Sequence, residues 1–197
     1  MTSSSLHAHL SFFGFAFGRN GVHTARTMMF NELHRLFDTV SAEDAEKEQY
    51  IAAIVRDNCL GKRSEKNRHL SCTHLVTLYS LDCRLVLFRT LRFFWHRDPQ
   101  SRPLLAALIC CARDELFRRT LPFLLALHEE ETYSRRALEE YIEAMAPERF
   151  SPATRQSVAQ NLAASWGQAG SLSGSVHKRR SRAHPGSGAV SYALLLG

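Results

Sequence analysis

Residues 58–68 read Asn58-Cys59-Leu60-Gly61-Lys62-Arg63-Ser64-Glu65-Lys66-Asn67-Arg68, and the chain on both sides is organised around this stretch. Gly61 can adopt the positive φ that ends a helix, and Ser64 is a good N-cap for the helix that follows. A helix, a turn with glycine and a second helix with a basic first turn together indicate a helix-turn-helix. The alternative is a plain hairpin of two helices with a solvated basic corner.

The polar side chains of this corner are the first candidates for contacts with DNA. Four cations lie within seven residues, and Glu65 is the only acid among them. A basic helix N-terminus can hold phosphates and present side chains to bases. The candidate residues are Lys62, Arg63, Ser64, Lys66, Asn67 and Arg68.

The distribution of charge along the chain indicates an anionic partner. The 197 residues include 25 Lys and Arg against 19 Asp and Glu, a formal net charge of +6. All the acids lie in residues 1–150, whereas residues 151–197 contain five cations and no acid. Such a positive end favours nucleic acid, a membrane surface or an acidic protein as partner. Most of the cations are arginines, which match phosphate geometry better than lysines do.

Cysteine usage and hydropathy indicate a globular cytoplasmic protein. With 45% hydrophobic and 22% charged residues, the chain can bury a core. Its five cysteines are odd in number, and the pair Cys110-Cys111 lies in an apolar run, which indicates reduced thiols. The longest apolar stretch, residues 104–112, is too short for a membrane span. Residues 1–19 lack the basic region of a signal peptide.

Hydrophobic periodicity predicts a mainly α fold: a multi-helix bundle with a helix-turn-helix-like N-terminal half and a winged-helix-like C-terminal unit. Helices are expected over residues 27–40, 64–79, 103–113, 114–127 and 138–145. Two more are expected to follow caps: one begins after the cap at 41–44 and ends at about 58, and the other begins after the cap at 81–82 and ends at 97. On the helix after residue 82, Arg84, Arg89 and Arg92 are expected on the polar face. We expect a loosely ordered arm over 1–26, the bundle over 27–149 and the C-terminal unit over 150–197.

The C-terminal unit has the pattern of a winged helix. Ser151-Pro152 caps a helix that Gly170 ends, and a basic hairpin bounded by glycines follows. The helix would offer polar side chains to bases, and the hairpin would lay cations on phosphates. The candidates are Arg155, Gln156 and Asn161 on the helix and Lys178, Arg179, Arg180 and Arg182 in the wing. The alternatives are a disordered basic tail and a truncated unit; the apolar residues 192–196 favour an ordered segment.

Four sequence segments together resemble those of a known protein family. They are residues 58–68, with Lys62-Arg63-Ser64; residues 78–92; residues 102–114; and residues 150–170. Over roughly residues 30–190 the chain resembles the small helical A component of bacterial BREX phage-defence systems. The resemblance implies an all-helical cytoplasmic protein that binds double-stranded DNA and serves a multi-protein defence complex. It also implies contacts at Lys62, Arg63, Ser64, Thr154 and Arg155.

No catalytic signature accompanies these patterns, so we expect neither an enzyme nor a cofactor. The sequence contains no P-loop, GxGxxG or GxSxG motif. A Ser or Cys nucleophile with a His base stays open, because such partners can be distant in sequence. His69, Cys72 and His74 lack the paired spacing of a zinc site.

The expected partners are double-stranded DNA and other defence-system proteins. The alternative is a scaffold or adaptor whose basic faces bind acidic protein partners within a multi-subunit complex. RNA is less favoured, because no aromatic stacking platform lies among the cations.

Overall fold

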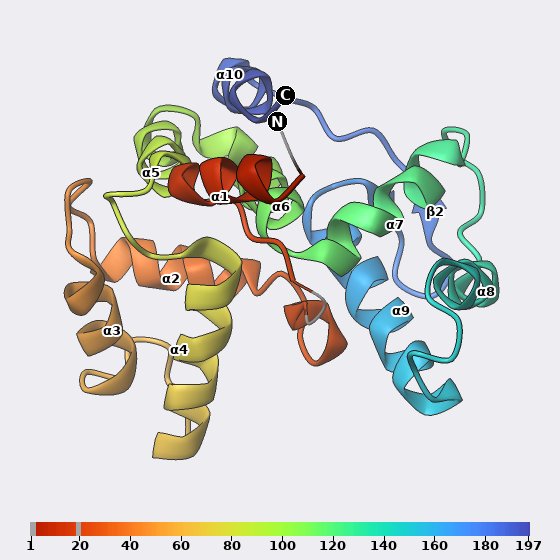
Figure 1. Ribbon diagram of the computed structural model, residues 1–197, viewed down its shortest axis with the longest axis horizontal. Helices are drawn as coiled ribbons and strands as arrows, with labels where there is room; N and C mark the ends of the chain where they lie inside the picture. Colours follow the sequence, from red (N-terminus) through yellow and green to blue (C-terminus); the bar gives the residue numbers. More distant parts are fainter. Residues whose placement is uncertain (1–2, 19–20) are drawn as a thin grey trace.

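The computed structural model describes residues 3–18 and 21–197, and its fold is mainly α, as the periodicity predicts (Figure 1). The α-helices of this described part are α1 (Ser3–Phe13), α2 (Phe30–Thr39), α3 (Lys47–Val55), α4 (Glu65–Tyr79), α5 (Val86–Arg97), α6 (Arg102–Arg113), α7 (Glu115–Ala126), α8 (Arg135–Met145), α9 (Pro152–Gln168) and α10 (Ser187–Leu196). Two 3-10 turns and two strands complete the order: η1 (Val22–Thr24), η2 (Pro99–Ser101), β1 (Leu172–Ser173) and β2 (Arg179–Arg180). Within residues 3–18 and 21–197, no helix combines the length and the hydropathy that a membrane crossing requires.

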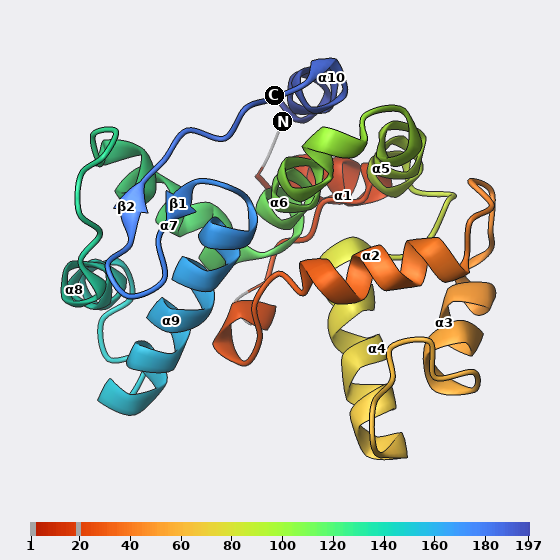
Figure 2. The same ribbon diagram turned by 180° about the vertical axis from the view of Figure 1, so that it is seen from behind.

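The helices gather at two ends of the molecule around a shared middle. Helices α2, α3 and α4 form one end, with α5 above α2, and α7, α8, α9 and the strands form the other; α6 lies between the two ends, and α10 lies at the top (Figures 1 and 2). One hydrophobic core runs through these elements, from Val22 to Tyr192. It crosses both boundaries suggested by the sequence, at residues 26/27 and 149/150.

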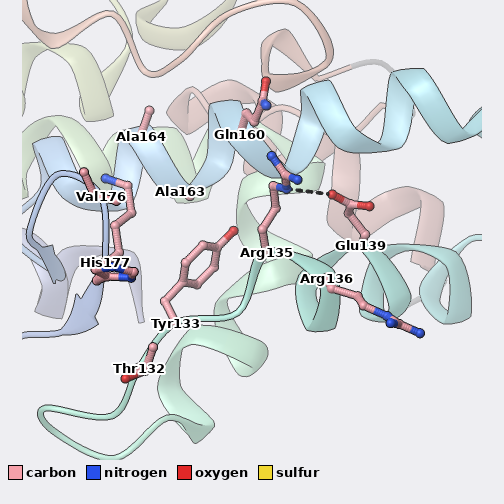
Figure 3. A pocket seen from close by; sticks show the side chains of 11 residues that line it. Thr132, Tyr133, Arg135, Arg136, Glu139, Gln160, Ala163, Ala164, Val176 and His177 are labelled. Carbon is pink, nitrogen blue, oxygen red and sulfur yellow. Dashed lines mark ion pairs between the residues drawn. The ribbon is translucent and has the colours of Figure 1, made fainter.

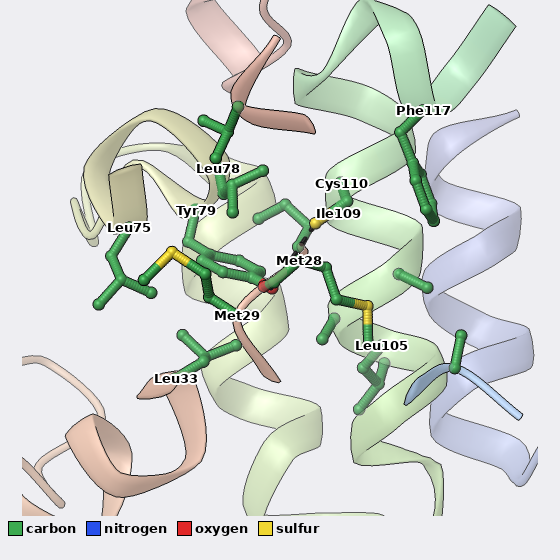
Figure 4. Packing of buried hydrophobic residues seen from close by; sticks show 14 of the residues in the cluster. Met28, Met29, Leu33, Leu75, Leu78, Tyr79, Leu105, Ile109, Cys110 and Phe117 are labelled. Carbon is green, nitrogen blue, oxygen red and sulfur yellow. Dashed lines mark hydrogen bonds between the residues drawn. The ribbon is translucent and has the colours of Figure 1, made fainter. Parts of the chain in front are cut away.

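The centre of the core is the short segment that leads into α2. Met28 and Met29 lie among side chains of α4 and α6 (Figure 4), and both are buried. The hydroxyl of Tyr79 donates to the carbonyl of Met28, and Cys110 Sγ donates to that hydroxyl over 3.6 Å. Met29 adopts a φ of +54°, which turns the chain sharply before α2 begins. The polar atoms at the centre of the core are thus paired, as burial requires.

The described residues of the N-terminal segment, 3–18 and 21–26, contain a helix and a 3-10 turn. Helix α1 and η1 both lie within residues 1–26, and the side chains of Val22 and His23 are buried. Phe15 packs against the core, whereas Phe12 is 76% exposed. Phe15 therefore docks on the body, whereas Phe12 does not.

Several helix ends follow the local chemistry that predicted them. Ser64 Oγ accepts from the Asn67 amide over 3.3 Å, which opens α4, and Ser151 Oγ accepts from the Thr154 amide over 3.2 Å, which opens α9. Gly170 adopts a φ of +77° just after α9, where only glycine is free of strain. These caps depend on residues within one helical turn, so the sequence predicts them well.

Several helix starts differ from the prediction; α2, for example, begins at Phe30 and not at residue 27. Helix α3 begins at Lys47 and not after residues 41–44, because Glu46 and Gln49 form a reciprocal capping box. Helix α5 begins at Val86 and not directly after residue 82. Ser80 and Leu81 adopt φ values of +65° and +53°, so the backbone turns there before it can continue as a helix.

Arg92 was expected on the polar face of α5, but its side chain is fully buried. Its Nη2 donates to the carbonyls of Val40, Ser41 and Ala42, each over 2.9 Å. The guanidinium also lies 4.2 Å from the centroid of the Phe37 ring. Arg92 therefore closes the turn that follows α2 by satisfying three carbonyls that no helix satisfies.

The C-terminal residues form an ordered hairpin and a docked helix. Strands β1 and β2 pair antiparallel, with Leu172 opposite Arg180. Helix α10 packs on α5 and α6, and the Tyr192 hydroxyl donates to the carbonyl of Leu87 over 3.0 Å. Tyr192 is buried, but other apolar residues of the segment are exposed: Val176, Val190, Leu194 and Leu195.

Gly188 allows α10 to dock, and its replacement by valine should release the helix. The Gly188 amide donates to Asp98 Oδ2 over 2.9 Å, and a Cβ at residue 188 would lie 2.8 Å from Asp98 Cβ. We expect a loss of about 1–3 kcal/mol in unfolding free energy and rapid amide exchange over residues 187–196. Ser191→Val, on the exposed side of α10, is the control. Parent-like exchange in Gly188→Val would show that the close approach to Asp98 is unimportant.

Candidate nucleic-acid interface

The basic corner between α3 and α4 is a loop held by the side chain of Asn58. The Lys62 amide donates to Asn58 Oδ1 over 2.8 Å, and Asn58 Nδ2 donates to the carbonyl of Lys62 over 3.1 Å. Asn58 and Gly61 adopt φ values of +50° and +64°. Residues 56–64 separate the two helices, so the loop is longer than the roughly three- or four-residue turn of a DNA-binding helix-turn-helix.

The six predicted residues of the corner divide into exposed and structural groups. Lys62 is half-buried, and its Nζ lies 3.0 Å from Glu32 Oε1. Arg68 is also half-buried, and its Nη1 donates to the carbonyl of Val55 over 2.8 Å, at the end of α3. Both cations therefore tie α4 to neighbouring helices. The exposed residues are Arg63, Ser64, Lys66 and Asn67.

The exposed group lies at the free N-terminus of α4. In Figures 1 and 2 this end of α4 projects from the body, beyond the loop that leads to it from α3. His69, Leu70 and Thr73, further along α4, are also exposed. Among residues 3–18 and 21–197, neither Arg63 nor Lys66 has an ion-pair partner. Amides at a helix N-terminus, together with free cations, favour the binding of phosphate.

The polar face of α9 is mostly occupied by contacts within the protein. Arg155 forms an ion pair with Glu143 of α8, and Asn161 Nδ2 donates to the carbonyl of His23 over 3.1 Å. The Thr154 hydroxyl lies 2.9 Å from Ser151 Oγ, within the cap of α9. Gln156 alone of the four predicted residues is exposed without such a contact among the described residues. Arg155 and Asn161, which were predicted to face bases, therefore each make a contact within the protein that a base would have to replace.

The surroundings of the hairpin carry less positive charge than the sequence of residues 151–197 alone indicates. On the side away from β1, β2 forms backbone hydrogen bonds with the acidic loop before α8. The Glu130 amide donates to the Arg180 carbonyl over 2.9 Å, and the Arg180 amide donates to the Glu131 carbonyl over 2.8 Å. Arg179 lies 3.9 Å from a Glu130 carboxylate oxygen, and Arg180 Nη1 donates to the carbonyl of Ser171 over 3.1 Å. The acids of residues 129–131 thus lie beside the cations that residues 151–197 contain.

The two predicted basic units do not come together. The N-terminus of α4 and the hairpin lie at different ends of the molecule in both ribbon views. Arg182, in the linker to α10, and Arg179 remain exposed at the hairpin end. In the described part of the chain, the exposed cations of the corner and those of the hairpin therefore lie at different ends of the molecule and do not form one surface.

A buried polar cluster was missed by the sequence analysis. His23 Nδ1 lies 3.0 Å from Asp114 Oδ2, and His23 Nε2 lies 3.0 Å from Ser165 Oγ. The order Asp–His–Ser and these distances match a nucleophilic triad. However, the three side chains are 0–1% exposed, the Ser165 hydroxyl donates to the Asn161 carbonyl over 2.8 Å, and Ser165 Oγ accepts from the Met28 amide over 2.8 Å.

This cluster joins three distant segments of the chain. Asp114 caps α7 by accepting from the Phe117 amide over 3.0 Å and also accepts from the His23 amide over 3.2 Å. Burial alone would raise the pKa of Asp114, but the hydrogen bonds and the charge of His23, with the two amides, lower it overall. A Cβ on Gly21 would lie 2.3 Å from Asp114 Oδ1, so only glycine fits there. In the sequence, only the helix-cap position of Asp114 indicated a structural role, whereas nothing near His23 indicated one.

Comparison with known protein families finds none that matches the chain, and comparison with curated proteins finds no similar sequence. Within residues 3–18 and 21–197, no group of three or more His, Cys, Asp or Glu residues is arranged to hold a metal ion.

Proposed function

We propose that this chain is a non-enzymatic protein that binds double-stranded DNA through the N-terminus of α4. The observation that carries the proposal is the projecting helix end with Arg63, Lys66 and Asn67 exposed around it. The amides and the two cations suit phosphates, and Asn67 suits the edge of an adenine. Arg179 and Arg182 would add weaker phosphate contacts at the other end of the molecule.

The wider setting of the proposal depends on the resemblance to the BREX A component. On the strength of that resemblance, we propose a bacterial cytoplasmic protein that serves a phage-defence complex with other defence-system proteins. The burial of Ser165, His23 and Asp114 supports a protein without hydrolytic activity, because a substrate would have no access to the hydroxyl. The alternative is a scaffold or adaptor whose same exposed cations bind acidic protein partners.

Reversing the charge of both free cations, in Arg63→Glu with Lys66→Glu, should weaken binding to duplex DNA at least tenfold at low salt. The slope of log affinity against log salt should become shallower by about 0.9 for each lost phosphate contact. Because both side chains are exposed, the thermal midpoint should stay near that of the parent. Fluorescence anisotropy with a labelled duplex measures affinity and slope together.

The matched control is Arg89→Glu, which reverses an exposed cation on α5. It should leave both affinity and slope close to the parent values. If the parent shows no duplex binding at low salt but binds an acidic protein, the scaffold alternative replaces the DNA proposal. Equal losses in Arg89→Glu and in Arg63→Glu alone, which change the net charge by the same amount, would mean that binding follows net charge and not this site.

A further inference from the structure

A groove opens between α8, α9 and the hairpin, at the end of the molecule away from the corner (Figure 3). It encloses about 620 Å³, within the range of roughly 300–1,000 Å³ typical of small-molecule sites. Ala163 and Ala164 line it from α9, so that the helix presents a smooth surface there, with the amide of Gln160 beside them.

The polar lining of the groove is mainly cationic. Arg135 from the first turn of α8 and Lys178 from the end of the hairpin loop both line it, and Glu139 is its only acid among the described residues. Arg135 Nε lies 3.2 Å from Glu139 Oε1, and the two side chains are 51% and 25% exposed. This ion pair is accessible to solvent, so an incoming anion can compete with Glu139 for the guanidinium at little cost.

Tyr133 supplies a donor that has no partner inside the protein. Its hydroxyl oxygen is buried and has no hydrogen-bond partner among the described residues. In Figure 3 the ring lies in the groove between His177 and Arg135. Burial raises the pKa of Tyr133 well above its usual value. The phenol therefore keeps its proton at neutral pH and can donate a hydrogen bond.

We propose that this groove binds a nucleotide, with its phosphate held by Arg135, Lys178 and the Tyr133 hydroxyl. A phosphate takes two donors from a guanidinium and one from each of the other groups. The faces of Tyr133 and the alanine surface of α9 leave an apolar area for a flat base. The first turn of α8, capped by Ser134, adds a positive dipole on the same side.

The nucleotide could be free or part of a single strand of nucleic acid, since both present the same phosphate and base. This inference does not depend on the proposed function, because Arg63 and Lys66 lie at the other end of the molecule. The variant with both corner cations reversed should therefore bind a nucleotide as the parent does, even if it no longer binds duplex DNA.

The test is titration of the full-length protein with ATP, without divalent metal, by isothermal calorimetry. Glu139→Gln removes the competing carboxylate and should tighten binding roughly threefold to fivefold, whereas Arg135→Gln should weaken it at least fivefold. Tyr133→Phe removes only the hydroxyl and should weaken it as well. Arg89→Gln is the control, because Arg89 is an exposed cation of α5 that does not line the groove; its affinity should match the parent.

Competition identifies the source of the nucleotide. A short single-stranded oligonucleotide that displaces ATP, with the same ranking of variants, assigns the site to nucleic acid, and failure to displace it assigns the site to free nucleotides. Displacement by inorganic phosphate at the same concentration as ATP would overturn the nucleotide assignment. Absence of binding by the parent to both probes at millimolar concentration would overturn the whole inference, as would equal losses in Arg89→Gln and Arg135→Gln.

Discussion

Replacing Asp114 with alanine should lower the free energy of unfolding by about 3–5 kcal/mol, because it leaves a buried histidine without its carboxylate. The same change removes the cap of α7 and the acceptor for the His23 amide. Urea titration followed by circular dichroism measures the loss. Ser165→Ala should cost less, about 1–3 kcal/mol, since it removes neutral hydrogen bonds and no charge.

The chain offers a matched control for this prediction. His34 and Asp38 form a second histidine–aspartate pair at 2.9 Å, but their side chains are 37% and 62% exposed. Asp38→Ala should therefore change the unfolding free energy by no more than about 1 kcal/mol. Equal losses in Asp38→Ala and Asp114→Ala would contradict the view that burial makes the Asp114 pair important.

Asp114 should also make stability depend on acid pH. Its pKa is lowered in the folded protein, so the carboxylate stabilises the fold above its unfolded pKa of about 3.9. That contribution is lost as the pH falls through the lower, folded pKa, where the native state must take up the proton. The Asp114→Ala variant should show a shallower loss of stability than the parent between about pH 4 and the folded pKa.

Replacing Arg92 with alanine should have a comparable effect, again about 3–5 kcal/mol. The change leaves three carbonyls after α2 without their donor and removes a large side chain packed on Phe37. We expect faster amide exchange in residues 40–46 as well as lower global stability, because the turn between α2 and α3 loses its attachment to α5.

Arg89→Ala is the control for Arg92, since Arg89 lies on the same helix but is exposed. It should change the unfolding free energy by less than about 0.5 kcal/mol. Arg92→Met keeps much of the packing but not the donors, so it separates the two contributions. A loss in Arg92→Met as small as in Arg89→Ala would show that the hydrogen bonds to the turn contribute little.

The helical character of the chain and several helix ends could be predicted from the sequence, because they depend on residues close together in the chain. Ser64 caps α4 and Ser151 caps α9 through amides within one turn. The exposed group at the corner, Arg63 and Lys66, was predicted for the same reason. A helix N-terminus that begins in a polar loop exposes its first turn regardless of what packs further along.

Tertiary structure decided which polar side chains are available to a partner. Lys62, Arg155 and Arg92 read as surface cations, yet each is bound to a segment from 12 to 52 residues away. The acidic loop beside β2 likewise reduces a charge excess that residues 151–197 show when read alone. Sequence charge is summed along the chain, whereas electrostatic potential depends on distance in space.

The buried cluster of His23, Asp114 and Ser165 shows the same limit most clearly. Its members are 91 and 142 residues away from His23 in the chain, and each residue type is common on protein surfaces. Only the packing of η1 against α7 and α9 removes them from water, and removal from water is what makes their pairing obligatory. Local pattern therefore predicts that helices form and where some of them begin, and burial decides which of their polar residues hold the fold together.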